Sequence, residues 1–185
     1  MNKHLEPVFR ILLHGIEKTG FNYWVYGGVS VAAYAGKFFR SNKDVDIFVR
    51  DNEFERIRLI LQKLCDQNNF ELIQEGEKSK RPKIEIKING YKKFSMIPIC
   101  QKDNIVVFLY EKRYGGDQEY PNQILERVER DIFGYRFFTP QDGFIKEMFI
   151  NHIKARPDKK NRDNFKIDAK AILNSGDFAK LNWVL

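Results

Sequence analysis

The sequence has few of the residues and segments that mark disulfide-rich, zinc-binding or membrane-spanning proteins. Its two cysteines, Cys65 and Cys100, have a spacing that fits neither a zinc site nor a disulfide framework. Both lie in apolar stretches, so we expect them to be reduced core residues. No apolar run reaches the roughly 18 residues that a membrane span needs, and residues 1–7 contain no signal-peptide core. We therefore expect a cytoplasmic protein with no membrane partner.

Repeats and low-complexity segments are also missing, and the composition is typical of a folded domain. Hydrophobic residues make up 43% of the chain and charged residues 31%, which excludes a disordered class. The 16 phenylalanines and 8 tyrosines cannot all stay exposed, so many must lie in a core. Histidine is scarce, and His4, His14 and His152 have no spaced partners, so we expect no histidine metal site.

The charge balance favours the basic residues. Lys and Arg number 32 against 25 Asp and Glu, which gives a net charge of +7. A basic surplus suggests polyanionic partners such as nucleotides or nucleic acid. The alternative is a solvated basic surface with no such partner. The lysines are spread along the chain, so any basic patch has to be assembled by folding.

Hydrophobic periodicity predicts a mixture of helices and strands. Apolar residues three and four apart indicate helices, and strict alternation indicates strands. Asn89-Gly90 is a strong signal for a two-residue hairpin turn. We expect helices at residues 5–19, 29–37 and 53–67, strands at 21–26, 44–50, 70–74, 83–88, 91–99 and 105–110, and a strand hairpin at 127–138.

The C-terminal part has helical patterns. Thr139 as N-cap and Pro140 at the first position predict that a helix begins there. The order of elements predicts an α+β fold, with a mixed β-sheet flanked by helices and a small helical part after it. We place the boundary near residue 139, which divides the chain into domains at 1–138 and 139–185.

The stretch with the most chemical information begins where a strand ends at Tyr26. Gly27 and Gly28 follow, and a helix with Ser30 near its start comes next. Glycines let backbone N–H groups approach phosphate oxygens with no Cβ in the way, and a helix N-terminus favours negative charge. By itself, a Gly-Gly pair after a strand is usually just a tight turn.

Asp44 and Asp46 stand two apart on the next strand, so both carboxylates project from the same face. Such a pair repels itself unless a cation lies between the two groups. Hard carboxylate oxygens suit Mg²⁺ (or Mn²⁺) held together with substrate phosphates. Arg40 and Lys43 come just before and can reach the same phosphates. Asp-x-Asp alone is more often a solvated strand face, but with the glycine turn it predicts a metal and nucleotide site.

This combination resembles the signature of the DNA polymerase β superfamily of nucleotidyltransferases. That signature is an apolar strand, Gly-Gly or Gly-Ser, a short helix, often an arginine, and then Asp-x-Asp. The sequence is similar in particular to the minimal branch, which includes lincosamide and aminoglycoside nucleotidyltransferases and abortive-infection toxin-type enzymes. Residues 21–51 carry the likeness most clearly. Residues 125–174 extend it through a strand hairpin, a helix start at Thr139, and the later Arg162-Asp163 and Asp168.

The resemblance implies a nucleotidyltransferase-like mixed sheet, with the C-terminal helical segment closing a cleft. It implies an enzyme that moves a nucleoside monophosphate from a triphosphate to a hydroxyl acceptor and releases pyrophosphate. A third carboxylate is expected on a later strand, and Glu85 is the main candidate beside Asp44 and Asp46, with Glu71 in reserve. Glu85 would bind a second metal ion or act as general base for the acceptor hydroxyl. The alternative is that Glu85 belongs to a solvated strand face of alternating charge.

The same resemblance implies roles for groups around the triphosphate. The two glycines and Ser30 would cradle the outer phosphates, and Arg40 would neutralise the leaving pyrophosphate. One lysine of the C-terminal helices is expected on the opposite wall of the cleft, and two candidates stay open. Arg162-Asp163 is open between a surface ion pair and a positioning role. The expected nucleotide-binding residues are Gly27, Gly28, Ser30, Arg40, Lys43, Lys146 and Lys154.

Three functions remain open at this point. The net charge favours RNA (transfer-RNA-like, as for the toxin-type enzymes) over a cationic antibiotic as the acceptor. A small-molecule enzyme of the antibiotic type is the first alternative. An inactive nucleotide-binding or interaction module of the same fold is the second, and the presence of both Asp44 and Asp46 argues against it. The sequence does not determine the oligomeric state.

Overall fold

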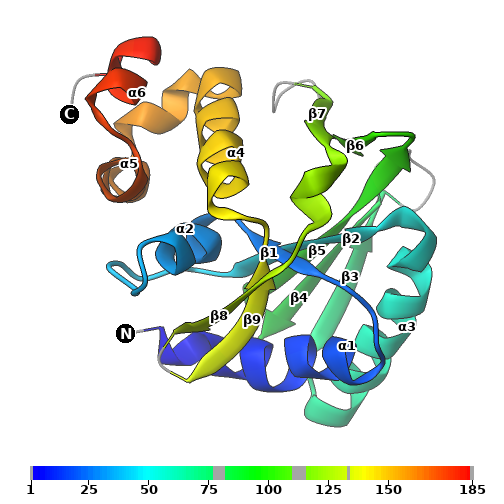
Figure 1. Ribbon diagram of the computed structural model, residues 1–185. Coiled ribbons are helices and arrows are strands. Elements are labelled where there is room, and N and C mark those ends of the chain that lie inside the picture. The colour runs from blue at the N-terminus through cyan, green and yellow to red at the C-terminus, as the bar shows by residue number, and fades with distance from the viewer. Residues whose placement is uncertain (1, 77–81, 110–115, 133, 184–185) are drawn as a thin grey trace.

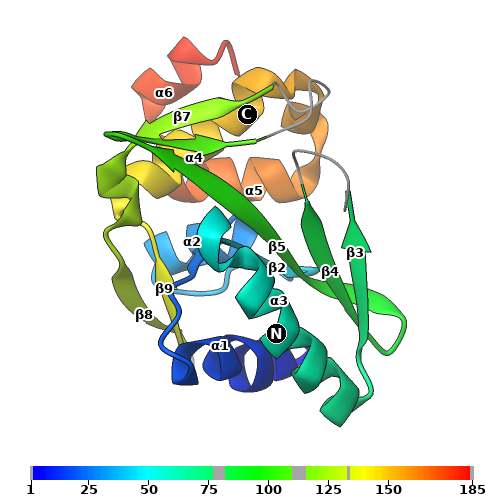
Figure 2. The same cartoon turned by 90° about the vertical axis from the view of Figure 1, so that its right-hand side faces the viewer.

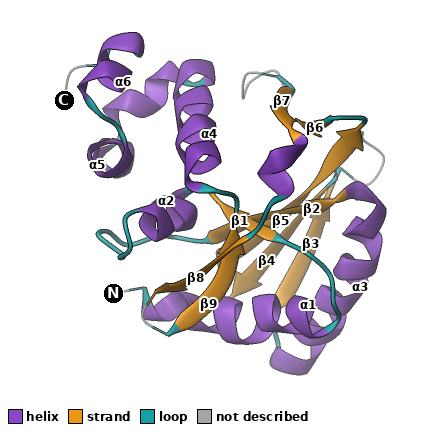
Figure 3. Ribbon diagram, in the orientation of Figure 1, coloured by secondary structure: helices purple, strands orange, loops and turns teal. Residues whose placement is uncertain are grey.

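The computed structural model describes residues 2–76, 82–109, 116–132 and 134–183. Helices flank one large β-sheet, and a helical part follows it (Figure 1, Figure 3). The predicted α+β fold class is therefore confirmed. In the part of the chain that the structure describes, no helix has the length and apolar character needed to cross a bilayer.

The large sheet has seven strands. They are β1 (Trp24–Tyr26), β2 (Val45–Arg50), β3 (Glu71–Glu75), β4 (Lys83–Ile88), β5 (Tyr91–Lys102), β6 (Ile105–Phe108) and β7 (Gln118–Pro121). Their order is β1-β2-β5-β4-β3, and β6 and β7 extend the sheet from the C-terminal half of β5 (Figure 2). β2 runs parallel to β5, while β1–β2, β3–β4 and β4–β5 are antiparallel. This pairing brings β2 and β4 to the two sides of β5.

Residue alternation gives the two faces of the sheet different roles. Along β2, Val45 and Ile47 are buried in a core with the N-terminal helical segment and α3 (Asp51–Asn68). Asp46 and Phe48 point to the opposite face. There Phe48 is buried and stacks on Trp24, with ring centroids 5.2 Å apart. Asp46 therefore projects away from the main core, where a solute can reach it.

The N-terminal segment is less regular than its periodicity predicts. A 3-10 turn at Lys3–Leu5 is followed by a π-helical stretch at Val8–Leu13 and then by α1 (His14–Lys18). The wider π turn still keeps the apolar side chains on one face. The apolar residues spaced three and four apart in the predicted helix 5–19 are all buried: Leu5, Val8, Phe9, Leu12, Leu13 and Ile16.

The C-terminal part has a core of its own. β8 (Val128–Ile132) and β9 (Tyr135–Thr139) form a separate hairpin that leads into α4 (Asp142–Ala155), a 3-10 segment at Pro157–Asn161, α5 (Asp163–Ile172) and α6 (Ser175–Lys180). These helices pack around Phe149, Ile153 and Trp183. Val31 of α2 (Gly28–Tyr34) belongs to the same cluster. The helical part therefore packs on α2, which also contacts β2, the strand that contains Asp46. The proposed boundary near residue 139 stays a prediction.

Two local predictions have different outcomes. The Asn89-Gly90 turn is confirmed, because both residues have positive φ, 52° and 77°, as a tight hairpin turn requires. The helix start at Thr139 is wrong, because α4 begins at Asp142 with Gln141 as N-cap. Thr139 is instead the last residue of β9, paired with Val128, and its hydroxyl accepts a hydrogen bond from Arg130. The sheet pairing holds Thr139 extended, so the helix starts later.

Candidate active site

A cleft of about 710 Å³ lies between the start of β2 with α2 on one side and the helices α4 and α5 on the other. The strand–glycine–helix stretch and the paired aspartates form one wall, as the sequence predicts. The opposite wall comes from the C-terminal helices. Of the predicted site residues, those that line the cleft are Gly27, Gly28, Ser30, Arg40, Lys43, Asp44 and Asp46.

Gly27 is required by both its backbone and its surroundings. It has φ 71° and ψ −148°, a conformation that disfavours side chains. A Cβ added there would lie 3.1 Å from Oδ2 of Asp46, tighter than most real contacts. The Ser30 hydroxyl donates a 2.8 Å hydrogen bond to the Gly27 carbonyl, which fixes the turn. The glycine therefore lets Asp46 approach the backbone at the start of α2.

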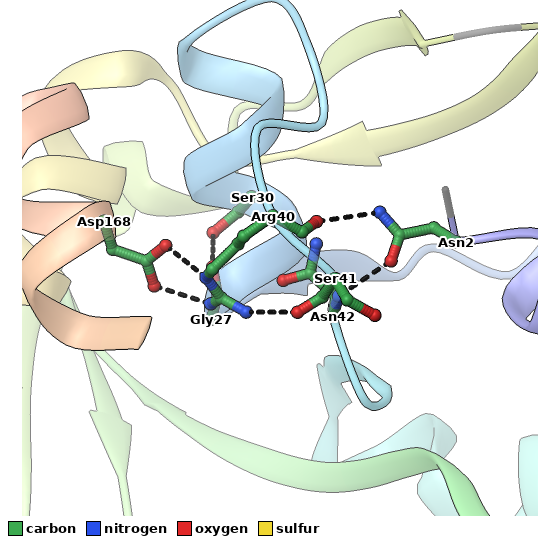
Figure 4. Close-up of polar contacts among 7 residues, drawn as sticks. All are labelled: Asn2, Gly27, Ser30, Arg40, Ser41, Asn42 and Asp168. Carbon is green, nitrogen blue, oxygen red and sulfur yellow. Dashed lines mark hydrogen bonds and ion pairs between the residues drawn. The ribbon is translucent and has the colours of Figure 1, made fainter. Parts of the chain in front are cut away.

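Gly28 makes room for an arginine rather than for a solute. A Cβ at this position would clash with the Arg40 guanidinium and with the Asn42 side chain. Arg40 donates through Nε and Nη2 to the two oxygens of Asp168 on α5, each at 2.6 Å (Figure 4). A third donation goes from Nη1 to the Ser41 carbonyl at 3.0 Å. The predicted phosphate role of Arg40 stays a prediction, because the described structure engages its guanidinium with Asp168.

The N-terminus of the described chain braces the same loop, which the sequence did not reveal. Asn2, in a left-handed conformation with φ 63°, donates from Nδ2 to the Arg40 carbonyl and accepts from the Asn42 N–H (Figure 4). The Asn42 side chain is buried against the cleft, and both its amide atoms lack a partner among the described residues. Buried polar atoms of this kind are normally paired. A bound solute would satisfy them.

The two aspartates sit at the start of β2. Asp44 precedes the strand and Asp46 is its second residue, so both carboxylates face the cleft. The Ser95 hydroxyl on β5 donates to Oδ1 of Asp46. Burial raises the pKa of Asp46 to about 6, and the negative charge of Asp44 adds to the effect. This pair is the arrangement that a divalent cation would stabilise.

Glu85 lies close to the aspartates, but the contacts of its carboxylate are lysine ammonium groups. The register places Ser95 between them, since Asp46 pairs with Ser95 on one side and Glu85 pairs with Ser95 on the other. Burial acts to raise the pKa of Glu85, but ion pairs with Lys83 and Lys92 hold it below its usual value. Among the described residues, no group of three His, Cys, Asp or Glu side chains is placed to bind a metal ion. The role of Glu85 as third carboxylate stays a prediction.

The reserve candidate, Glu71, lies away from the cleft. It is on the edge strand β3, and its Oε1 atom is 3.5 Å from Nζ of Lys87. The sequence also indicates a basic loop from Lys78 to Lys83, most of which lies outside the described residues.

The cations on the opposite wall differ from the two predicted ones. Lys146 is bound to Asp177 of α6 at 2.6 Å, and Lys154 is exposed, so neither lines the cleft. Lys159 and Arg162 line it instead. They lie in and just after the 3-10 segment Pro157–Asn161 that joins α4 to α5. The cluster of basic residues at positions 154–162 was the sequence feature that could have indicated cations on this wall.

His152 adds an uncharged polar group to the same wall. Its ring stacks on the Phe165 ring, with the ring centroids 5.5 Å apart and an angle of 15° between the ring planes. The buried Nε2 atom has no hydrogen-bond partner among the described residues. Burial lowers the pKa of His152 to about 4, with the charges of Lys159 and Arg156 acting in the same direction. The imidazole is therefore neutral near pH 7. The sequence identified no role for this residue.

Comparisons with known proteins agree with this geometry. Residues 8–89 match the model of the aminoglycoside-2''-adenylyltransferase family. The solved structure of the antibiotic-resistance factor ANT(2'')-Ia is similar, with a TM-score of 0.67 and 13% identity over 98% of this chain and 90% of that chain. The lincosamide antibiotic adenylyltransferase LnuA, solved with lincomycin bound, has a TM-score of 0.61 and 18% identity over 90% of this chain and 94% of that chain. Curated protein sequences contain no match.

The chain thus has the polymerase β-like fold of the minimal nucleotidyltransferases, as the resemblance predicted. Within that class, the part that matches a family model is the N-terminal part with the glycine turn and the paired aspartates. Together these matches support a nucleotidyltransferase enzyme.

Arg40→Ala should strongly destabilise the fold. The Arg40 and Asp168 side chains are only 13% and 4% exposed, so the variant leaves a buried carboxylate without its partner. The free energy of unfolding should fall by about 3–5 kcal/mol. Arg10→Ala is the control, because it removes an exposed pair with Glu6 and should cost less than about 1 kcal/mol. Urea unfolding measures both, and equal losses would contradict the structural role of the Arg40 pair.

His152 should make the fold acid-sensitive. Its pKa is lowered from 6.5 to about 4 on folding, so the unfolded chain binds more protons in that range. The stabilisation is complete above about pH 6.5 and is lost as the pH falls toward 4, to a total on the order of 3 kcal/mol. His152→Gln should remove this part of the pH dependence, and His14→Gln, at an exposed helix position, should not. Unfolding measured from pH 4 to 8 would refute the assignment if both variants follow the wild type.

Proposed function

We propose that this protein is a divalent-metal-dependent nucleotidyltransferase. It transfers a nucleoside monophosphate from a nucleoside triphosphate to a hydroxyl acceptor and releases pyrophosphate. The observation that carries the proposal is the pair Asp44 and Asp46, packed against Gly27 at the edge of a 710 Å³ cleft with cations on its far wall. A triphosphate with its metal ion has the charge pattern that such a cleft complements.

The residues fit a hard divalent cation. Asp44 and Asp46 supply carboxylate oxygens from one face, which Mg²⁺ and Mn²⁺ prefer. The raised pKa of Asp46 reflects burial and like-charge repulsion that a cation would relieve. When bound, the ion would neutralise phosphate charge and help to orient the triphosphate.

The surrounding side chains would position the triphosphate. Gly27 and Gly28 line the cleft, and the unpartnered amide of Asn42 lies beside them. Lys43 on the near wall and Lys159 and Arg162 on the far wall supply positive charge to the outer phosphates. Held between these walls, the α-phosphorus would be exposed to an acceptor.

The transfer step balances as a single displacement. The acceptor oxygen forms a bond to the α-phosphorus while the bond from that phosphorus to the bridging oxygen breaks. Pyrophosphate leaves with the electron pair, and a base takes the hydroxyl proton. Glu85 remains the predicted base, although its ion pairs with Lys83 and Lys92 make it a weaker one.

Two acceptor classes have support. The basic surplus of the whole chain favours an anionic acceptor, RNA being the main candidate. The similarity to ANT(2'')-Ia and LnuA, which are antibiotic enzymes, favours a small hydroxyl-bearing molecule. Both depend on the same transfer centre, so the acceptor is a separate question from the chemistry.

The first experiment tests the transfer itself. The protein is incubated with Mg²⁺, each labelled nucleoside triphosphate, and either total cell RNA or a panel of aminoglycosides and lincosamides. Asp44→Asn and Asp46→Asn should each lower label transfer by a factor of at least about 1000, because each weakens the metal site. The melting temperature of Asp46→Asn should equal or exceed that of the wild type, because one buried like charge is removed.

Asp103→Asn is the matched control. Asp103 is exposed in the turn between β5 and β6 with φ 46°, a conformation that asparagine tolerates. It should keep wild-type transfer. Activity retained in the Asp44 or Asp46 variants, with a lowered melting temperature, would show that these aspartates are structural.

The second experiment concerns the cations. Lys159→Ala and Arg162→Ala should each weaken binding of a non-hydrolysable triphosphate by about tenfold or more, the loss of one charge-assisted contact. Lys146→Ala and Lys154→Ala, which lie outside the cleft, should change it by about twofold or less. Calorimetry in the presence of Mg²⁺ compares the affinities of the four variants. A larger loss of affinity in Lys146→Ala or Lys154→Ala would show that one of those lysines, as the sequence predicts, binds the phosphates.

The third experiment concerns the acceptor. If RNA lies across the basic walls, its affinity should fall with salt by roughly 0.7 log units per phosphate contact per log unit of salt. Filter binding over a salt series measures the slope. A slope near zero, with label on an antibiotic and none on RNA, would establish the small-molecule class.

A further inference from the structure

β5 contains a bulge beside the two aspartates. Ile86 of β4 pairs with Phe94, but the next residue, Lys87, pairs with Lys92, so Lys93 is an extra residue on β5. A bulge breaks the alternation and re-aims the side chains beyond it. Lys92 therefore faces the same side as Lys87 and the carboxylates, instead of the core side that Phe94 occupies.

The re-aimed ammonium lies between the carboxylate of Glu85 on β4 and that of Asp44, the residue just before β2. Nζ of Lys92 is 3.1 Å from Oδ2 of Asp44 and 3.4 Å from Oε1 of Glu85. The Glu85 side chain is 16% exposed and that of Lys92 34% exposed, so water screens the contacts only in part. Asp44 and Glu85 are thus already bridged by a positive charge that belongs to the chain.

A two-metal transfer centre would need that position for an ion. In such a centre the carboxylates hold two cations that clamp the attacking and leaving oxygens. Here Asp44 and Asp46 remain for one cation, whereas Glu85 contacts ammonium groups and no third carboxylate joins the pair among the described residues. The carboxylate set fits one metal ion and not two.

We propose that the Lys92 ammonium takes the place of the second metal ion, so that this centre binds a single divalent cation on Asp44 and Asp46. Lys92 is then a positioning residue, which holds Glu85 beside the aspartates and cancels part of their charge. The inference rests on the proposed function for the nature of the centre. The bulge at Lys93 is the local feature that places the Lys92 ammonium at this position.

The test counts ions directly. Mn²⁺ is titrated into the protein with electron paramagnetic resonance detection of free Mn²⁺, alone and with a non-hydrolysable triphosphate. The wild type should bind one Mn²⁺ at this centre. Lys92→Met keeps the length of the side chain without its charge and should bind Mn²⁺ about tenfold tighter or admit a second ion. Lys92→Arg keeps the charge and should behave as the wild type.

Lys93→Met is the matched control, because Lys93 is the bulged neighbour and lies over the Tyr91 ring rather than between carboxylates. Two ions in the wild type would overturn the inference, as would unchanged number and affinity in a folded Lys92→Met variant. If that variant does not fold, the number of Mn²⁺ ions bound by the wild type alone tests the inference. Failure of the triphosphate to bind would overturn the proposed function, while the titration with Mn²⁺ alone still tests Lys92.

Discussion

The Arg40–Asp168 ion pair is the contact on which the shape of the cleft depends. It joins the loop before β2 to α5, two segments that form opposite parts of the candidate site. Both side chains are largely buried, so separating them would leave charges without water or partner. Because the guanidinium packs over Gly28, the same contact explains why that position has no side chain. One interaction thus sets the distance between the walls and the course of the loop that leads to the aspartates.

Both walls of the cleft carry charges of both signs. Asp44 and Asp46 lie with Arg40 and Lys43 on the near wall, and the far wall combines Lys159 and Arg162 with Asp163 and Asp168. A bulge places a further cation, Lys92, beside Asp44 and Glu85. Such a mixture suits a ligand that combines a metal ion with phosphate charge. The neutral His152 ring adds a polar atom without adding charge.

The local patterns of the sequence predicted most of the fold. Strand alternation at residues 83–88, the turn at Asn89 and the burial of the first helical segment follow from periodicity and backbone preference, which act over a few residues. The Thr139 cap failed because a strand partner, Val128, held that residue extended. Strand pairing outweighed a local capping preference. The strand β7 was missed for the same kind of reason, since its support comes from pairing with β6.

For the candidate site, the sequence by itself determined that two carboxylates share one face beside a glycine turn, because spacing along a strand and the lack of a Cβ are local properties. Only the tertiary structure decided which cations face them. Arg40 pairs with Asp168, 128 residues away in the sequence, Lys146 pairs with Asp177, and a bulge turns Lys92 away from the core side and toward the carboxylates. Long charged side chains reach several directions from one backbone position, so their partners are chosen by packing and not by sequence spacing.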